Sequence, residues 1–385
     1  MSDKPTSFGE PALAKYLNVK ARQQGVPLGG NFELTPCCNL SCKMCYVRLS
    51  KRQVDEKGGL LSAAQWKDYI KQAVDAGMLM MLLTGGEPTM RPDFAEIYEY
   101  AHESGVLVSV NTNGTLMTDE IFELFKKLPP QRINITLYGS SADTYRELCG
   151  SGEAFERVVE AIKRIKREGF SLKLNHTITG HNYADTMNVI DLAERLDTLM
   201  IHTSYVFPPA RRAGESTDRL SPEEAAEMGL KASRRMMTPE EYKRFLIKSL
   251  QGDPAVSPME ECVDLTEGGA IRCRAGSSNF WLAWDGSLRP CAIIPYPTVD
   301  IKAEGGFKPA WDKLRGIVAG MHTPAKCETC AARNICHVCA AACISETGRV
   351  DGVPDYLCRR ADAMINIMRR ELAELSAGED TDNEA

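Results

Sequence analysis

The chain has 385 residues, 43% of them hydrophobic, which is enough to bury a large core in two or more structural units. Its formal net charge is −6 and its basic residues are dispersed, unlike the concentrated basic footprint of a nucleic-acid binder, so we expect no nucleic-acid partner. No apolar stretch approaches the ~18 residues of a membrane span, and the N-terminus lacks a signal-like segment. We therefore expect a cytoplasmic protein with no membrane partner.

The first two-thirds of the chain alternate short apolar runs with amphipathic segments. Six units of this βα kind predict an α/β fold with a parallel sheet, either an open Rossmann-like sheet or a partial (β/α)6 TIM-like barrel. The apolar runs predict strands over 32–35, 79–83, 107–111, 133–137, 172–178 and 200–206. The amphipathic segments predict helices over 62–76, 91–104, 118–127, 155–168 and 183–196.

Local end signals mark several of these helices. Ser62 and Asp93 lie near helix starts, where a side chain that caps the first turn is expected. Gly105 and Gly169 follow helix ends, where a left-handed residue commonly stops a helix. These positions support the helix boundaries that the apolar periodicity predicts.

The last third of the chain differs, because cysteines replace the regular alternation. Such a pattern is typical of a small domain that metal holds together instead of a large core. The segment 280–289 predicts a β-hairpin around Asp285-Gly286, and 359–375 predicts a last helix. We divide the chain into an N-terminal extension (1–27), a barrel (28–220), a helical bridge (221–261), a cysteine-rich domain (262–360) and a C-terminal helix with an acidic tail (361–385).

Cys38, Cys42 and Cys45 follow the first predicted strand at x3 and x2 spacing. Three thiolates of this kind hold three irons of a [4Fe–4S] cube and leave the fourth iron open for chemistry. A structural zinc site normally has four ligands, and no His or Cys follows Cys45 at a suitable spacing. The other alternative is three buried cysteines without a ligand role.

The string Gly85-Gly86-Glu87-Pro88 follows the second predicted strand. Glycines at the carboxyl end of a parallel strand let the backbone approach a ligand closely. Asn113 and Thr136 follow or end the third and fourth strands and face the same mouth of the sheet. The alternative is turn chemistry for Asn113 and β-propensity for Thr136.

These features together resemble the radical S-adenosylmethionine (radical SAM) superfamily over about residues 28 to 360. The resemblance implies an enzyme that cleaves S-adenosylmethionine to a 5′-deoxyadenosyl radical, which abstracts a hydrogen from the substrate. The catalytic residues would be Cys38, Cys42 and Cys45, as ligands of the [4Fe–4S] cluster. Gly85, Gly86, Glu87 and Pro88 would bind the methionine part, with Asn113 and Thr136 near its ribose or carboxylate.

The C-terminal cysteines resemble the SPASM extension of radical SAM maturases, which carries one or two auxiliary [4Fe–4S] clusters. The spacing before Cys339 is x2, where x3 is commoner, so Cys343 competes with Cys339 for one ligand position. Zinc is the alternative metal, since Cys-x2-Cys pairs also bind zinc. The resemblance assigns one cluster to Cys327, Cys330, Cys336 and Cys358, and a second to Cys273, Cys291 and Cys339, with Cys262 as a candidate fourth ligand.

The resemblance leaves the substrate open. The main hypothesis is a ribosomally made peptide that receives a thioether, a carbon–carbon crosslink or an epimerised residue, and the alternative is a tetrapyrrole side chain. Sulfatase maturation is disfavoured, because Ala292 stands where those enzymes have an Asp. A zinc-binding module without activity is the hypothesis from another class. The partners implied are a peptide or small-molecule substrate, an electron donor such as flavodoxin or ferredoxin, and a separate peptide-recognition protein.

Several other residues have structural interpretations. We expect Cys37 and Cys149 to be small buried hydrophobes, and His176 to be a satisfied core histidine. Trp281 and Trp284 are expected in the core of the hairpin. The sequence predicts neither the oligomeric state nor the bond that the enzyme forms.

Overall fold

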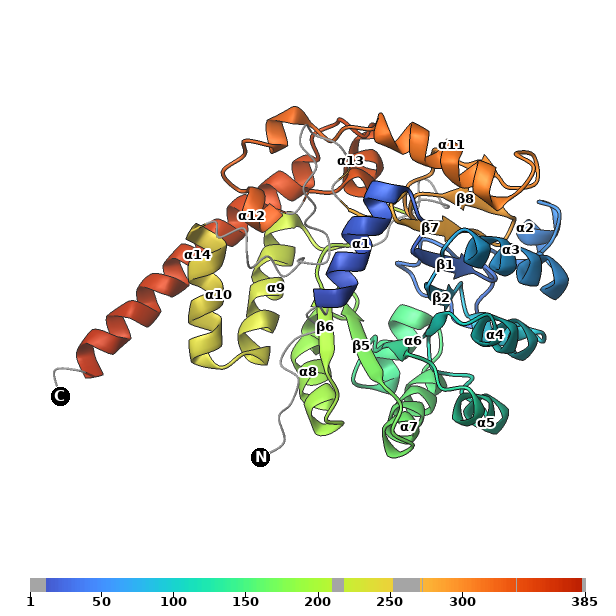
Figure 1. Cartoon of the computed structure of the whole chain (residues 1–385). Helices are drawn as coiled ribbons and strands as arrows, with labels where there is room; N and C mark the ends of the chain where they lie inside the picture. The colour runs from blue at the N-terminus through green and yellow to red at the C-terminus, as the bar shows by residue number, and fades with distance from the viewer. Residues whose placement is uncertain (1–11, 210–217, 252–270, 272, 337, 383–385) are drawn as a thin grey trace.

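A computed structural model describes residues 12–209, 218–251, 271, 273–336 and 338–382. The predicted ligand Cys262 lies outside the described residues. Nine strands form one sheet in the order β6-β5-β4-β3-β2-β1-β7-β8-β9, with helices packed along its outer side (Figure 1). No helix in the described ranges is both long and apolar enough to span a bilayer.

The first six strands confirm the predicted α/β fold. Neighbours pair in parallel and in chain order, without the reversal of strand order that marks an open Rossmann-like sheet, so the barrel alternative is the correct one. The strands are β1 Gly29–Glu33, β2 Met80–Thr84, β3 Leu107–Thr112, β4 Arg132–Thr136, β5 Leu172–Thr177 and β6 Met200–Thr203.

Amphipathic helices cover the outside of these strands. In α7, the buried residues Val158, Ile162 and Ile165 lie on the face that the sequence predicts, and each stabilises the fold by roughly 1.5–3 kcal/mol through burial. The outer helices are α3 Ala63–Asp75, α4 Phe94–Glu103, α5 Asp119–Lys127, α6 Ala142–Cys149, α7 Glu153–Arg167 and α8 Thr186–Arg195, preceded by the 3-10 turn η2 Tyr183–Asp185.

Most predicted helix ends are confirmed. Ser62 forms a capping box with Gln65, in which each side chain accepts a hydrogen bond from the other residue's backbone N–H. Gly105 and Gly169 adopt φ values of +80° and +78° after α4 and α7. Asp93 differs: it occupies the N-cap position of α4 but makes no capping hydrogen bond.

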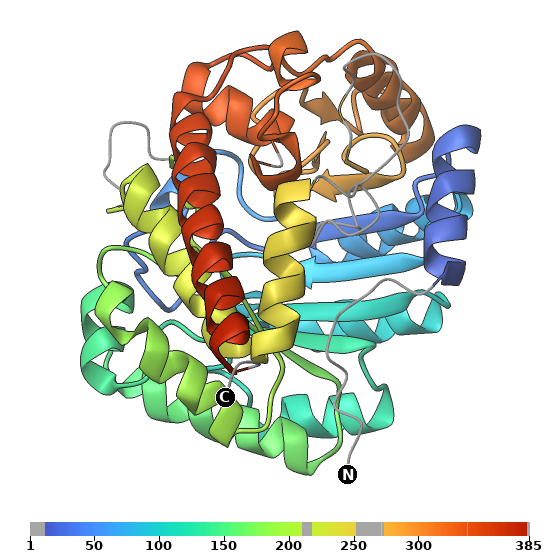
Figure 2. The ribbon, with the colours of Figure 1, turned by 90° about the vertical axis from the view of Figure 1, so that its left-hand side faces the viewer.

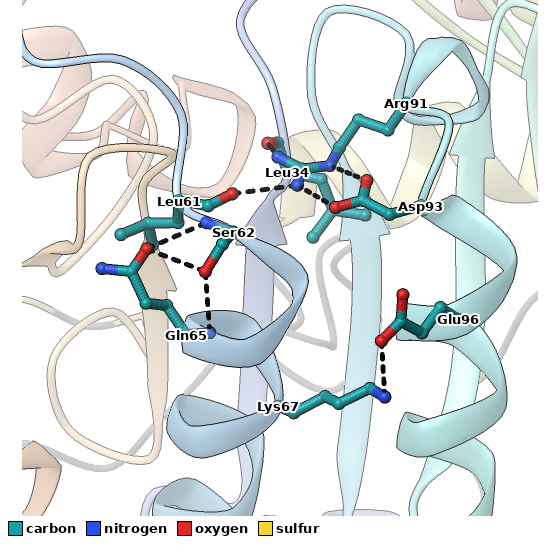
Figure 3. Close-up of polar contacts among 8 residues, drawn as sticks. All are labelled: Leu34, Leu61, Ser62, Gln65, Lys67, Arg91, Asp93 and Glu96. Atoms are coloured by element: carbon teal, nitrogen blue, oxygen red, sulfur yellow. Dashed lines mark hydrogen bonds and ion pairs between the residues drawn. The ribbon is translucent and has the colours of Figure 1, made fainter.

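The carboxylate of Asp93 instead pairs with the buried Arg91 (Figure 3). The same guanidinium donates to the carbonyls of Leu34 at 2.8 Å and Leu61 at 2.9 Å. Arg91 thereby ties the end of β1 and the residue before the α3 cap to the start of α4. The Asp93 cap was predicted wrongly because a buried arginine needs a counter-charge more than the exposed helix end needs a cap.

The C-terminal strands continue the barrel sheet. The predicted hairpin is confirmed, with β7 Asn279–Leu282 antiparallel to β8 Ser287–Arg289 and Gly286 at φ +84° in the turn. β7 also pairs in parallel with β1, opposite Gly29 to Phe32. A short strand β9, Val299–Asp300, follows β8.

Three long helices follow the barrel strands. The predicted bridge is two helices, α9 Pro222–Met236 and α10 Pro239–Gln251, and α14 Asp355–Asp382 packs against both (Figure 2). Helix α9 also packs against α8 and β6, while α10 and α14 line a cavity. The remaining helices are α1 Ala12–Gln24, α2 Lys51–Asp55, α11 Phe307–Ala319, α12 Arg333–Cys336 and α13 Ala340–Thr347, with 3-10 turns η1 Pro88–Met90 and η4 Ala325–Cys327.

Candidate functional site

A cavity of about 680 Å³ lies at the carboxyl ends of the parallel strands. The loops after the strands form one wall, and residues of α10, α12 and α14 form the other. The cysteines of the N-terminal motif and two cysteines of the C-terminal region line this same cavity: Cys38, Cys42, Cys45, Cys336 and Cys339.

The N-terminal cysteine loop follows β1 and is held by backbone hydrogen bonds. Ser41 and Lys43 donate their N–H groups to the carbonyls of Cys149 and Leu148 at the end of α6, at 2.9 and 3.0 Å. The Cys38 sulfur accepts from the backbone N–H of Leu40 at 3.4 Å. These bonds fix the loop to the barrel helix α6.

The three motif thiols differ in their surroundings. Burial raises the pKa of Cys38 to about 12. A hydrogen bond from the Cys149 thiol lowers the pKa of Cys42, which favours its thiolate form. Cys149 is buried as predicted. It also forms a hydrogen bond with the motif residue Cys42, which the sequence did not predict.

Thiolates alone are the usual ligands of iron–sulfur clusters, so the donor chemistry of this loop fits a [4Fe–4S] group. Among the residues that the structure describes, no three His, Cys, Asp or Glu side chains converge as ligands of a single metal ion. The three motif cysteines instead face a cavity that has room for further ligands.

Gly85 and Gly86 line the cavity and lie against the cysteine loop. A Cβ atom on Gly86 would lie 2.3 Å from the carbonyl oxygen of Cys37, and one on Gly85 would lie 2.4 Å from that of Thr35. The Gly86 N–H donates to the Thr35 carbonyl at 2.6 Å. The glycines are therefore required where two backbones meet, whereas the sequence predicted a close approach to a ligand.

Glu87 and Pro88 lie behind the cavity wall and do not line it. The fully buried Glu87 carboxylate accepts from the Thr112 hydroxyl at 2.8 Å and from the Asn113 N–H at 2.6 Å. Burial raises its pKa, while the hydrogen bonds from Thr89, Asn113 and Thr112 oppose that shift. Glu87 thus fixes the loop after β2 to the end of β3.

Asn113 and Thr136 both line the cavity, as predicted. The Asn113 amide is already engaged: it donates to Asn39 at 2.9 Å and accepts from the Thr115 hydroxyl at 2.6 Å. Within the described ranges the Thr136 hydroxyl makes no side-chain hydrogen bond, so it is available to a ligand.

Thr136 belongs to a ring that the sequence analysis missed. Each of the strands β2 to β6 ends in a threonine that lines the cavity. The signal was present in the sequence as a threonine at the end of each apolar run, but threonine also suits strands for reasons of β-propensity. The ring consists of Thr84, Thr112, Thr136, Thr177 and Thr203.

The predictions for the two tryptophans of the hairpin have different outcomes. Trp284 is buried beside Leu49 and Val54, as expected for a core residue. Trp281 lines the cavity and donates its indole N–H to Glu33 at 3.1 Å, so the prediction that it is a core residue was wrong. Its position follows from the pairing of β7 with β1, which no local pattern reveals.

His176 is buried, and its Nδ1 lies 2.8 Å from the Leu137 carbonyl. Burial lowers its pKa to about 4, which keeps the ring neutral. Its Nε2 has no partner within the described residues. The prediction that His176 is a core residue is therefore correct, but only one of its two ring nitrogens has a hydrogen-bond partner.

Four C-terminal cysteines lie close together. Burial and the neighbouring thiols raise the pKa of Cys336 to about 12. These neighbours come from three elements, η4, the loop before α12 and α14, and they are Cys358, Cys327 and Cys330. They are the set that the sequence assigned to one auxiliary cluster.

The structure describes three of the four cysteines proposed for the second cluster, Cys273, Cys291 and Cys339. Cys339 caps α13 by accepting from the Ala342 N–H at 3.4 Å, and it lines the cavity. Cys343, one turn later, is fully buried in the core, and burial raises its pKa to about 12. Burial also raises the pKa of Cys291.

Comparison with known proteins agrees with this architecture. Residues 32–193 match the family model of the Radical SAM superfamily. An AdoMet-dependent heme synthase of Methanosarcina barkeri is 26% identical over 343 residues, 85% of this chain and 93% of that protein. A PqqA peptide cyclase of Ruegeria pomeroyi is 25% identical over 348 residues, 86% of this chain and 84% of that protein.

Among solved structures, anSMEcpe with bound AdoMet superposes with a TM-score of 0.68 at 16% identity, covering 91% of this chain and 96% of that one. This likeness confirms the partial TIM-like barrel. The cofactors of the family are a [4Fe–4S] cluster and S-adenosylmethionine. The chain is therefore an enzyme with a Radical SAM domain over residues 32–193, followed by a cysteine-rich C-terminal region.

Proposed function

We propose that this enzyme abstracts a hydrogen atom from a substrate held between two iron–sulfur clusters. Cys38, Cys42 and Cys45 would hold the cluster that binds S-adenosylmethionine, and the four C-terminal cysteines around Cys336 would hold an auxiliary cluster. The observation that carries this proposal is the single cavity that both cysteine groups line. When bound, the first cluster and S-adenosylmethionine supply the one-electron chemistry that starts the reaction.

The chain's own residues bind and orient the reactants. The backbone at Gly85 and Gly86 and the Thr136 hydroxyl line the cavity at the strand ends. On the opposite wall, Phe245 of α10 and Met368 of α14 add apolar surface. Once the substrate fills it, such a cavity would shield a reactive carbon radical from side reactions.

The crowding of thiols around Cys336 supports the auxiliary cluster. Neighbouring thiolates repel one another unless a cation neutralises them, and bound iron deprotonates its thiol ligands. Because Cys336 lines the cavity, a cluster there would contact the substrate or accept an electron from it. Cys339 is the candidate for a further cluster position, with Cys273 and Cys291 as its proposed companions.

We propose a ribosomally made peptide as the substrate, modified by a thioether, a carbon–carbon crosslink or an epimerisation. The PqqA peptide cyclase, which matches over most of both chains, supports this proposal. Reduced flavodoxin or ferredoxin in the cytoplasm would supply the electrons, and a separate recognition protein would deliver the peptide.

A tetrapyrrole side chain is the second candidate. The observation that favours it is the match to the AdoMet-dependent heme synthase, which extends over 93% of that protein. Both candidates use the same hydrogen abstraction in the same cavity, and they differ in what enters it.

The test starts from enzyme reconstituted with iron and sulfide under anaerobic conditions. We expect about eight irons per chain for two cubes, and 5′-deoxyadenosine on addition of S-adenosylmethionine and dithionite. Cys42→Ala should abolish this product, whereas Cys37→Ala, the same change at the neighbouring cysteine, should retain it. Product formation by Cys42→Ala at the wild-type rate would refute the proposed cluster site.

Co-expression with short reading frames from the same gene neighbourhood tests the substrate. A mass change in such a peptide, dependent on Cys42, supports the peptide proposal. Loss of carbon dioxide from an added propionate-bearing tetrapyrrole, with no peptide modified, would favour the second candidate instead.

A further inference from the structure

One charged side chain stands out in the cavity. Of the described residues that line it, Arg360 is the one with an Asp, Glu, Lys, Arg or His side chain. It lies on α14, on the side of the cavity next to the end of β6, where its Nη2 donates to the Ser204 hydroxyl at 3.2 Å. A single cationic side chain in a cavity favours a ligand that carries an anionic group.

Arg360 has no carboxylate partner within the described residues. Its Nε is buried and makes no hydrogen bond. Glu346, which accepts from the neighbouring Tyr205 hydroxyl at 2.8 Å, is already bound by Arg219, with 3.1 Å between Nη2 and Oε2. The Glu346 carboxylate is therefore neutralised without Arg360, and the Cys336 thiol also lies near Arg360.

Arg91, which is buried, differs in being paired. It makes four hydrogen bonds, two to Asp93 and two to backbone carbonyls, as Figure 3 shows. A half-buried guanidinium without a carboxylate partner gains such a partner when an anion enters the cavity. The Arg360 side chain lines the cavity, so its guanidinium without a carboxylate partner lies beside a space that ligands enter.

The same helix face is otherwise apolar. Leu357, Met364 and Met368 line the cavity one turn before Arg360 and one and two turns after it. Methionine side chains adapt to flat or irregular apolar surfaces. The α14 wall therefore suits a molecule with an apolar body and one anionic group.

We propose that Arg360 binds a carboxylate of the substrate through its Nη donors and so positions the substrate between the two clusters. This inference rests on the proposed function and names the chemistry of its substrate. The carboxylate would belong to an Asp or Glu side chain or the C-terminus of a peptide, or to a propionate of a tetrapyrrole. The planar fork of an arginine matches a carboxylate better than a lysine does.

Two pairs of probes test the proposal by anaerobic equilibrium dialysis against the reconstituted enzyme. One pair is coproporphyrin III and its tetramethyl ester, and the other is an end-blocked Phe-Glu-Phe peptide and its Phe-Gln-Phe counterpart. We expect the carboxylate member of one pair to bind at least about 30-fold more tightly than its neutral partner. Which pair shows the preference identifies the source of the carboxylate.

Substitutions assign the preference to one side chain. Arg360→Met should reduce the ratio to near one, and Arg360→Lys should leave an intermediate ratio. Arg370→Met, at an exposed position of the same helix, should keep the full ratio. Iron content and visible absorbance show whether each variant is folded, and Arg360→Gln replaces Arg360→Met if that variant loses iron.

The proposal is overturned if neither pair shows a preference, or if the preference survives Arg360→Met. It is also overturned if Arg360→Met weakens S-adenosylmethionine binding while the probe ratio stays, because Arg360 would then hold the cosubstrate. A shifted auxiliary-cluster potential with an unchanged ratio would instead assign Arg360 to that cluster. Failure of the proposed function is separate, since it appears as absent iron or absent 5′-deoxyadenosine in the wild type.

Discussion

The two cysteine regions that meet at the cavity are supported in different ways. The N-terminal loop lies on a large barrel core and is fixed by backbone hydrogen bonds to α6 and to the glycines after β2. Most of the C-terminal cysteines lie in short helices and turns, where burial and the neighbouring thiols raise the pKa of Cys336 and Cys343. Hydrogen bonds and core packing therefore hold the first site in place without metal, whereas we expect the second site to need its metal for stability.

The largest expected effect tests this difference by removing metal. Cys336→Ala should lose about four irons, and amide exchange should rise strongly over 325–350 while the barrel strands stay protected. Cys42→Ala should lose a similar amount of iron with little change in exchange anywhere. Hydrogen exchange followed by mass spectrometry measures both variants. Equal loosening in the two would contradict the contrast.

Gly86→Ala should break the support of the N-terminal loop. Its Cβ atom would lie 2.3 Å from the Cys37 carbonyl, so the loop must shift, at a cost of about 2–4 kcal/mol and with loss of the first cluster. Gly316→Ala is the matched control, because this exposed glycine of α11 has open space and alanine favours a helix by about 1 kcal/mol. Thermal unfolding and iron content report both effects. Wild-type iron in Gly86→Ala would disprove the contact.

Asp185 offers a pH test within the barrel. Burial opposes its ionisation, but hydrogen bonds from Ser140, Asn188 and Thr144 outweigh burial and lower its pKa. Its stabilisation is therefore present above the unfolded pKa of about 3.9 and is lost as pH falls through the lower folded pKa. Asp185→Asn should unfold about 1–2 kcal/mol more easily at pH 7 and respond less to acid. Denaturant titrations at several pH values measure the free energy of unfolding of both proteins. The same pH dependence in Asp185→Asn as in the wild type would contradict this role of Asp185.

The smallest expected effect concerns two neighbouring cysteines. We expect Cys339→Ser to lower the iron content or alter the spectrum of the C-terminal region, because Cys339 faces the cavity. Cys343→Ser should cost only about 1–3 kcal/mol of stability from a buried hydroxyl, with full iron. The reverse outcome would make Cys343 the ligand.

The sequence predicted what is encoded locally. The six barrel strands, the hairpin at Gly286 and the Ser62 cap follow from short-range periodicity and turn chemistry, and the structure confirms them. The motif cysteines were found because their spacing in the loop after β1 is characteristic, and Gly85-Gly86 because they directly follow the second apolar run. The cavity that joins Cys38 to Cys336 follows from these elements only once the chain is folded.

The missed features depend on contacts between distant segments. Trp281 reaches the cavity because β7 pairs with β1, and Glu87 is buried because β3 presents two donors to it. Arg360 looked like any helical arginine, since nothing in 359–375 shows which face lies against the barrel. Asp93 occupies a position where a helix cap is expected, but its carboxylate pairs with Arg91 instead. Arg91 is buried there because it also bonds the distant carbonyls of Leu34 and Leu61.

The most direct test of the central claim is electron–nuclear double resonance on the reduced enzyme with S-adenosylmethionine labelled at its amino nitrogen. The three-thiolate loop predicts a nitrogen coupling to the open iron of the cluster, present in the wild type and in Cys37→Ala and absent in Cys42→Ala. A wild-type spectrum with reduced cluster but no nitrogen coupling would contradict the claim.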